Sequence, residues 1–353
     1  MRKSLVKRLL PTLIIFSSYL HSPSPITANQ ELKLEEFLSL KLNTQRLPES
    51  WSHKKNGESI YHYKSKSDVE ICKTVGLCHT PNHSIRHAAR TQQEILFNVN
   101  YEFDNHRRRK TPIALGSNRN NHLIVTGCSF ALGTSISESE TLPYHLAQKV
   151  NFLRPYNYGI AGTGTNSMLA QMRQHITKES IAETKGVFLY IFVDFHVPRA
   201  NAFAMEREWL LKTPAYAVKS PLKNLGFWNE AEPNWTKFFH STQTILKSVG
   251  INFNYPKRMK KHDQYVCKLI QAAKTNYLKK FPDGNFLVYS HPYQKMNEHL
   301  ISCLKKANII PIISKIDLET RDLIKFDEHP TSYLNLKIAN ELEPQIRSLL
   351  NEK

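Results

Sequence analysis

The sequence has little glycine, few cysteines and, beyond its N-terminal end, no long apolar run. Only 12 of its 353 residues are glycine, and no internal period is present, so a repeat protein is not expected. No stretch after residue 28 approaches the roughly 20 apolar residues that a membrane-spanning helix needs. The hydrophobic fraction of 41% instead indicates a buried core, in one large α/β domain with an appendage or in two ordinary domains.

The apolar run that is present lies at the N-terminus and has the pattern of a secretory signal peptide. Four cations lie within residues 1–8, residues 9–20 are mostly apolar, and Ala28 follows as a candidate cleavage position. Because this run is too short for a comfortable membrane span, residues 1–28 are predicted to be removed, leaving a periplasmic or secreted chain. The alternative is an uncleaved leader that anchors the chain to a membrane.

Positive charge is in excess, with 48 Lys and Arg against 30 Asp and Glu and a formal net charge of +18. Such a surface favours anionic partners, which for an exported chain are envelope polyanions. Residues 105–112 (NHRRRKTP) form a basic cluster that is also compatible with a nucleic-acid patch. No aromatic-interleaved binding module accompanies the cluster, so no nucleic-acid partner is expected.

The five cysteines are an odd number, so one is left over if the others pair in an oxidising compartment. Cys72 and Cys78 are close in sequence and form the natural first pair. Cys267 and Cys303 lie in two helical patterns around one strand and are candidates for the second pair. Cys128 is then the free thiol.

A zinc site is the alternative for the first pair, because His79, His83 and His87 lie in the same segment. The spacing of Cys72 and Cys78 fits no common zinc module, so a disulfide is preferred there. No metal and no cofactor are predicted.

Two regions with different patterns follow the leader. Residues 29–115 carry a helix signal over residues 31–42 and a strand signal over residues 94–105, and predict a small α+β region. Over residues 116–353 strands and helices alternate, which predicts a mainly parallel five-stranded sheet covered on both faces, a three-layer α/β/α fold. The expected strands cover residues 122–128, 156–162, 186–195, 285–292 and 308–314, and the expected helices cover residues 141–151, 165–176, 262–281, 298–307 and 332–350.

An insertion of about residues 197–261 separates the third and fourth expected strands. Its aromatic residues either pack the insertion onto the body of the protein or form a lid or an acyl- or glycan-binding wall near the site. These residues are Trp209, Tyr216, Phe227, Trp228, Trp235, Phe238 and Phe239.

Polar side chains gather where the predicted strands end, which is where open α/β sheets bind their ligands. Ser129 follows the first strand, glycines within residues 159–164 follow the second, and Asp327 and His329 come just before the last helix. Together they provide a nucleophile, a base, an orienting acid and backbone donors for an oxyanion, the set that acyl transfer needs. Further polar residues at strand ends are Asp194, His196, Ser290 and His291.

Three blocks of the sequence resemble the SGNH hydrolase superfamily, also called GDSL esterases and lipases. Residues 127–133 read GCSFALG where the family has Gly-Asp-Ser-x-x-x-Gly, Gly162 matches the second block, and residues 327–330 read DEHP against Asp-x-x-His-Pro. The resemblance covers about residues 115–350 without the insertion. It implies the flavodoxin-like, three-layer fold of this superfamily.

By this resemblance, Ser129 attacks an ester carbonyl, His329 takes the serine proton, and Asp327 orients the imidazole and stabilises its charged form. The backbone N–H groups of Ser129 and Gly162 would hold the oxyanion.

The sequence departs from the family pattern at three points. Cys128 replaces an aspartate that has no catalytic task in the family, and Asp327 precedes His329 by two residues instead of three. The asparagine that supplies the third oxyanion donor is absent after the third strand. Either His196 or Asn166 would replace this donor, or the oxyanion hole has only two donors.

The resulting prediction is an exported serine esterase that hydrolyses an acylated glycan, a lipid or a small ester through a covalent acyl-enzyme. Two alternatives stay open: an O-acyltransferase acting on envelope polysaccharide with the same residues, and a non-catalytic binding module with the hydrolase fold. Cys128 as nucleophile and His291 as base are less favoured. The residue before the motif serine points away from the cleft, and a strand-end histidine usually has a structural partner.

Overall fold

The computed structural model describes residues 50–55, 57–65, 67, 69–113, 118–201, 208–217, 222–231 and 258–350. The expected signal peptide over residues 1–28 and the expected helix over residues 31–42 lie outside these ranges. Among the described helices, none combines the length and the apolar composition that a membrane crossing requires.

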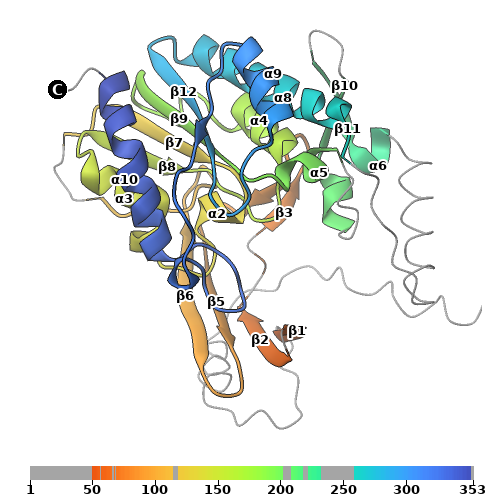
Figure 1. Ribbon diagram of the computed structural model, residues 1–353, viewed down its shortest axis with the longest axis vertical. Helices are drawn as coiled ribbons and strands as arrows, with labels where there is room; N and C mark the ends of the chain where they lie inside the picture. Colours follow the sequence, from red (N-terminus) through yellow and green to blue (C-terminus); the bar gives the residue numbers. More distant parts are fainter. Residues whose placement is uncertain are drawn as a thin grey trace, which may run out of the picture.

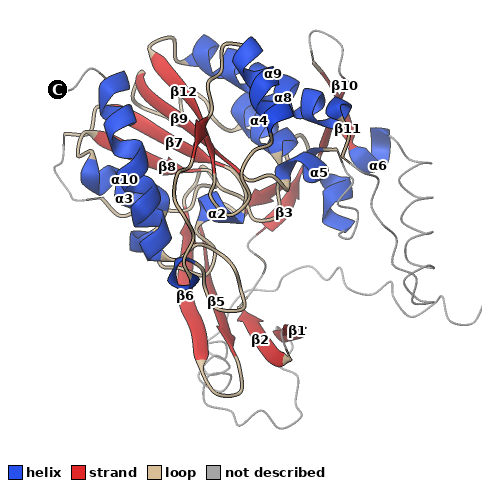
Figure 2. Ribbon diagram, viewed as in Figure 1, coloured by secondary structure: helices blue, strands red, loops and turns tan. Residues whose placement is uncertain are grey.

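The centre of the protein is a five-stranded sheet in which all neighbouring strands run parallel, in the order β13-β12-β9-β7-β8 (Figure 2). The predicted fold class is therefore confirmed. The strands are β7 (Asn121–Thr126), β8 (Leu153–Asn157), β9 (Lys185–Phe192), β12 (Gly284–Ser290) and β13 (Ile312–Ile313).

Helices cover both faces of this sheet (Figure 1). Along β9, Phe188, Tyr190 and Phe192 point to one face, whereas Val187 and Leu189 point to the other, as the alternation of a strand requires. The first face packs against α4 (Thr165–Gln174), α8 (Lys260–Lys280) and α9 (Glu298–Lys306), and the second against α3 (Leu142–Lys149) and α10 (Ser332–Leu349).

The predicted elements differ from the observed ones mainly at two strands. β8 ends at Asn157, because the residues that follow leave the sheet and pack on the helix after β7. A Cβ on Gly159 would lie 2.2 Å from the backbone nitrogen of Leu132. β13 begins only after Pro311, whose ring nitrogen has no hydrogen to donate to a neighbouring strand.

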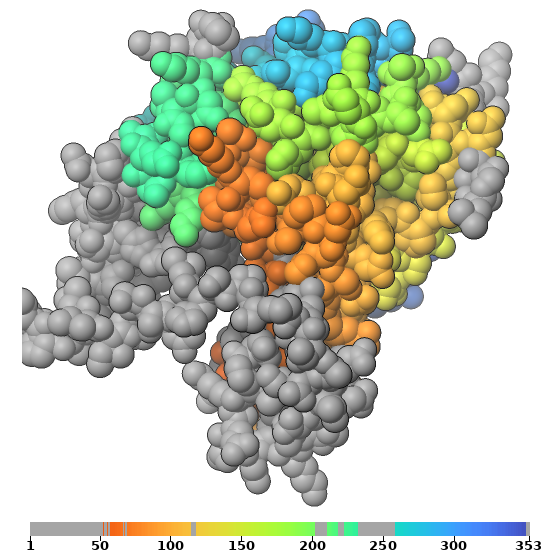
Figure 3. Space-filling view, turned by 180° about the vertical axis from the view of Figure 1, so that it is seen from behind, coloured from red at the N-terminus to blue at the C-terminus, as the bar shows by residue number. Residues whose placement is uncertain are grey.

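The N-terminal region forms a four-stranded antiparallel sheet in the order β1-β2-β5-β6 and a hairpin, β3-β4. The strand predicted over residues 94–105 is β6. Figure 1 shows this sheet extending away from the parallel sheet, and in Figure 3 other residues of the N-terminal region (orange), which include the hairpin, border the described residues of 208–231 (green) on the rear face. The strands are β1 (Ser50–Lys55), β2 (Glu58–Lys64), β3 (Val69–Cys72), β4 (Gly76–His79), β5 (His83–Arg90) and β6 (Ile95–Phe103).

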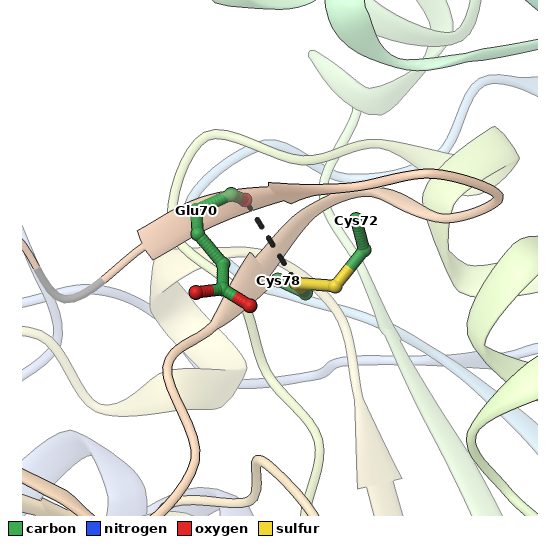
Figure 4. Close-up of side chains that lie close together, drawn as sticks. All are labelled: Glu70, Cys72 and Cys78. Carbon is green, nitrogen blue, oxygen red and sulfur yellow. Dashed lines mark hydrogen bonds between the residues drawn. A yellow bond between two sulfur atoms is a disulfide. The ribbon is translucent and has the colours of Figure 1, made fainter.

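Both predicted disulfides are present, between Cys72 and Cys78 and between Cys267 and Cys303, and Cys128 is free and buried. Figure 4 shows the first pair beside Glu70, whose carboxylate also forms an ion pair with Arg107. Ligand atoms of Glu70 and the two cysteines lie within 4.8 Å of one another.

The zinc alternative is not supported in the described residues. The two sulfur atoms are bonded to each other, and the nearby histidines have other contacts. Nε2 of His79 lies 3.0 Å from the carbonyl of Gly159, and Nε2 of His83 lies 3.0 Å from that of Ser67. His87 contacts the hydroxyl of Tyr101.

The basic cluster at residues 105–112 does not form the exposed patch that its composition suggests. Arg107 donates to the carbonyl of His79, and Arg108 pairs with Asp104 at 2.7 Å. Arg109 is only 1% exposed. Because all three cations are engaged in contacts within the protein, the nucleic-acid interpretation loses its main feature.

The described part of the insertion packs onto the body of the protein. Tyr216 lies in the core between α4 and α8, and its backbone N–H donates to the hydroxyl of Tyr265 at 3.1 Å. Trp228 packs against the same core. Trp235, Phe238 and Phe239 lie outside the described residues. The elements are α5 (His196–Ala200), η3 (Glu208–Lys212), β10 (Pro214–Ala217), β11 (Lys223–Phe227) and α6 (Trp228–Ala231).

Candidate active site

Ser129 sits on a sharp turn between β7 and a single helical turn, α2 (Ser129–Leu132). Gly127 has a φ of +148°, and a Cβ there would lie 2.8 Å from the carbonyl oxygen of Ile191, so this position requires glycine. Gly133 ends the turn in the left-handed conformation. The strand and the turn together present Ser129 at the carboxyl end of β7.

The loop after β8 lies directly against this turn. The backbone N–H of Ile160 donates to the carbonyl of Gly127 at 3.0 Å, and the hydroxyl of Thr163 donates to the same carbonyl at 3.3 Å. Between them, Gly162 adopts a left-handed φ of +80°. The glycine block of the second strand is therefore brought to the loop that carries Ser129.

Asp327 and His329 form a hydrogen-bonded pair, with 2.9 Å between Oδ2 of Asp327 and Nδ1 of His329. Their loop closes on itself, because the N–H of Ile324 donates to the carbonyl of His329 at 2.9 Å. Glu328, between them, has a left-handed φ of +61°. The shortened spacing thus still lets the carboxylate reach the ring. Since Nδ1–H donates to Asp327, Nε2 is the nitrogen left to accept a proton.

The carboxylate of Asp327 is mostly buried, with a side-chain exposure of 13%. Burial by itself raises the pKa of Asp327, but the hydrogen bond and the charge of His329 outweigh it and lower the pKa below its usual value. Asp327 is therefore charged at neutral pH and able to stabilise an imidazolium.

The His329 ring lies beside the turn that carries the serine. Its centroid is 5.5 Å from the ring of Phe130, the residue next to Ser129. Phe130 also packs against Phe195 at 5.7 Å and Tyr293 at 5.3 Å. These aromatic rings form an apolar wall next to the acid–base pair. Sequence reasoning missed this wall, although Phe130 lies within the serine motif itself.

Cys128 is not the nucleophile of this arrangement. Its side chain is fully buried, and burial raises the pKa of the thiol, so the reactive thiolate is disfavoured. It packs against Phe130 and Val193. The predicted role as a packing residue agrees with this position.

His291, the rival base, is also buried. Burial lowers its pKa to about 3, and its Nδ1 accepts the backbone N–H of Tyr293 at 3.2 Å. The ring packs edge-on to Phe130. His291 is thus a neutral structural side chain, and His329 is the histidine that has a carboxylate partner.

Asn166, one candidate for the third oxyanion donor, has its amide hydrogens directed elsewhere. The amide nitrogen donates to Oγ1 of Thr213 at 3.0 Å and to the carbonyl of Pro214 at 2.8 Å. It ties α4 to β10, so we leave Asn166 out of the oxyanion hole.

His196, the other candidate, is fully buried and neutral, because burial lowers its pKa well below the usual value. Its Nδ1 accepts from the backbone N–H of Val193 at 3.4 Å and lies 2.9 Å from the hydroxyl of Tyr190. The hydrogen therefore resides on Nε2, which has no hydrogen-bond partner among the described residues. Such a buried donor without an acceptor costs about 1–3 kcal/mol.

Arg109 holds the loop that follows α2, a role that the sequence pattern did not indicate. Its guanidinium donates to the carbonyls of Leu132 at 3.0 Å and Ile136 at 2.7 Å, and to that of Gly133. It also stacks on the ring of Tyr101 at 4.3 Å. A run of three arginines next to a predicted strand could have signalled buried ion pairs as well as a surface patch.

No protein-family model matches this chain, and no curated protein does. Similar solved structures include a protein of the G-D-S-L family from Desulfitobacterium hafniense DCB-2, with 11% identity, a TM-score of 0.35 and coverage of 64% of this chain and 99% of that chain. The acetyl xylan esterase Est2A from the rumen bacterium Butyrivibrio proteoclasticus has 10% identity, a TM-score of 0.40 and coverages of 68% and 65%. A carbohydrate esterase has 9% identity, a TM-score of 0.38 and coverages of 85% and 95%.

Proposed function

We propose that this protein is a serine hydrolase that cleaves a carboxylic ester through a covalent acyl-enzyme. The observation that carries the proposal is the hydrogen-bonded pair of Asp327 and His329, placed beside the turn that presents Ser129. A nucleophile, a base and an orienting acid in this order are the requirement of acyl transfer.

In the proposed reaction, Oγ of Ser129 attacks the ester carbonyl while Nε2 of His329 takes the hydroxyl proton. Asp327 stabilises the imidazolium that forms. His329 then gives the proton to the leaving alcohol oxygen as the ester C–O bond breaks. A water molecule, deprotonated by His329, attacks the acyl-enzyme and releases the acid and the free serine.

The oxyanion would be held by the backbone N–H groups of Ser129 and Gly162. The unpaired Nε2–H of His196 is the candidate for the third donor. Each such donor typically contributes about 3 kcal/mol of transition-state stabilisation.

We propose that a short acyl group or a sugar ring of the ester packs against the apolar wall of Phe130, Phe195 and Tyr293. We propose an acylated glycan, a lipid or a small ester as substrate, in an exported protein whose basic charge favours an anionic envelope surface. The disulfides are compatible with an oxidising compartment.

Hydrolysis of p-nitrophenyl acetate by the full-length chain tests this function. We expect turnover by the wild-type protein and a loss of at least 100-fold in kcat for Ser129→Ala and His329→Ala, with wild-type kcat for Ser84→Ala, an exposed serine on β5. Added acceptor sugar that becomes acylated would identify an O-acyltransferase. No turnover of any ester by the wild-type protein would favour the binding module.

A further inference from the structure

The turn that carries the acid–base pair has an unusual backbone. Phe326 has a φ of +64° and Glu328 a φ of +61°, so a left-handed residue other than glycine stands on each side of Asp327. The N–H of Glu328 donates to the carbonyl of Ile324 at 2.9 Å and closes the turn. Such a backbone persists only where surrounding contacts hold it. The contacts of this turn therefore bear on the geometry of His329.

Two segments far apart in the sequence hold the side chain of Glu328. Its Oε2 accepts from the hydroxyl of Tyr293, in the loop after β12, at 2.9 Å, and its Oε1 lies 2.7 Å from Nζ of Lys55, the last residue of β1. Burial and the hydrogen bond to Glu328 raise the pKa of Tyr293 to about 12. The hydrogen bonds from Lys55 and Tyr293 lower the pKa of Glu328. At neutral pH the phenol is therefore the donor and the carboxylate the acceptor.

The ring of Tyr293 belongs to the apolar wall beside the nucleophile. Its centroid lies 5.3 Å from the ring of Phe130, the residue after Ser129, and the Phe130 ring lies 5.5 Å from that of His329. Glu328 directly precedes His329 in the chain. The hydrogen bond between Tyr293 and Glu328 thus closes a circle of contacts that includes both the serine turn and the base.

We infer that Glu328 and Tyr293 are positioning residues of the proposed hydrolase, and that their hydrogen bond holds the turn of Asp327 and His329 against the serine turn. The inference rests on the proposed function and deepens it. A base must lie within hydrogen-bond reach of its nucleophile, and a displacement of about 1 Å can cost about 100-fold in rate. Because the Glu328 side chain is 49% exposed, its contacts contribute little to stability. The rate should therefore fall without a matching loss of stability.

Glu328→Asn tests this role, because asparagine tolerates the left-handed backbone but is shorter and uncharged. With p-nitrophenyl acetate we expect kcat about tenfold lower and KM within twofold, while the urea midpoint moves by less than about 0.3 M. The control is Glu319→Asn, which removes an equally exposed carboxylate, paired with Arg321 and Lys337, and should keep the wild-type kcat. A wild-type kcat in Glu328→Asn, or a loss of activity that follows a loss of stability, would overturn the inference.

Tyr293→Phe keeps the ring in the wall and removes only the hydroxyl. We expect kcat about fivefold lower, and a double variant with Glu328→Asn that is no slower than Glu328→Asn alone, because both substitutions remove the same hydrogen bond. Tyr333→Phe is the matched control, since its hydroxyl accepts from Arg321 at 2.7 Å, and it should match the wild type. Losses that multiply in the double variant would show that the two residues act separately, against the inference.

Hydrogen exchange gives a readout that does not depend on turnover. In proton NMR spectra, the Nδ1–H resonance of His329 is identified by its loss in His329→Gln. This hydrogen should exchange faster with water in Glu328→Asn and in Tyr293→Phe, because the pair with Asp327 opens more often once the turn is loosened. Wild-type exchange in both variants would contradict the inference. Absence of turnover by the wild-type protein would instead contradict the proposed function, and the exchange measurement would still decide on Glu328.

Discussion

At the scale of single residues, the carboxylate of Asp327 contributes both to the proposed catalysis and to the stability of the folded protein. It is held by His329 at 2.9 Å and carries a lowered pKa despite its burial. A group whose pKa is lower in the folded state stabilises the fold when it is charged. The same hydrogen bond fixes which nitrogen of His329 is available to Ser129. Replacing the carboxylate by an amide therefore affects both properties.

Asp327→Asn is predicted to reduce kcat on an ester substrate by about 10³-fold, because an amide neither fixes the tautomer of His329 nor stabilises the imidazolium. Steady-state kinetics with p-nitrophenyl acetate measures this loss. A kcat within threefold of the wild type would show that His329 works without Asp327.

The contribution of the Asp327 carboxylate to the unfolding free energy should decrease as the pH falls. The folded pKa of Asp327 is lowered from 3.8, so its contribution is present above that value and is lost as the pH falls through the folded pKa. The difference in unfolding free energy between wild type and Asp327→Asn should thus be largest near neutral pH and shrink in acid. Urea denaturation at several pH values measures it; a difference that does not change with pH would disprove the linkage.

At the scale of elements, Arg109 anchors the loop that follows the serine turn. It donates to three carbonyls, of which only that of Leu132 also accepts from another side chain of the described residues, the amide of Asn157. Without this anchor, the loop over residues 132–136 would lose the donors that hold it.

Arg109→Met is predicted to lower the unfolding free energy by about 3 kcal/mol or more, because it removes the donor to the carbonyls of Gly133 and Ile136. The neighbouring Lys110→Met removes an exposed ion pair with Glu102 and should cost less than about 1 kcal/mol. Equal effects of the two substitutions in urea denaturation would show that Arg109 is not the anchor.

Much of the parallel sheet could be predicted from the sequence, since its strands are apolar on both faces and its helices are amphipathic. The helix predicted over residues 332–350, for example, is α10 (Ser332–Leu349). The direction of Arg109 could not be predicted, because a charged run gives no sign of which member turns inward. The contact between Tyr101 and the backbone N–H of Ser135 could not be predicted for a related reason, because the two residues lie far apart in the sequence.

At the scale of the whole molecule, the N-terminal sheet supports the loop of the acid–base pair. Lys55 of β1 pairs with Glu328 at 2.7 Å, and Glu94, at the turn before β6, pairs with Lys325. Exposed ion pairs of this kind contribute little each. The buried hydrogen bond from the backbone N–H of Ser135 to Tyr101 of β6 joins the N-terminal sheet to the loop that follows the serine turn.

The disulfide between Cys267 and Cys303 joins α8 to α9 on the face of the sheet away from α10. Its sequence separation of 36 predicts a loss of about 4 kcal/mol in unfolding free energy for the double variant Cys267→Ala, Cys303→Ala. Activity in the folded state should be retained, because neither cysteine contacts the proposed site. Urea denaturation and ester hydrolysis by the same preparation would measure the stability and the activity of the double variant. Loss of activity without loss of stability would contradict a purely structural role of this disulfide.

The central claim is that Ser129 is a nucleophile activated by His329. Treating the full-length protein with a fluorophosphonate and locating the adduct by peptide mass spectrometry tests it most directly. We expect one adduct on Ser129, no labelling of Ser129→Ala, and labelling of His329→Ala slowed by at least 100-fold. An adduct on another residue, or equal labelling of wild type and Ser129→Ala, would contradict it.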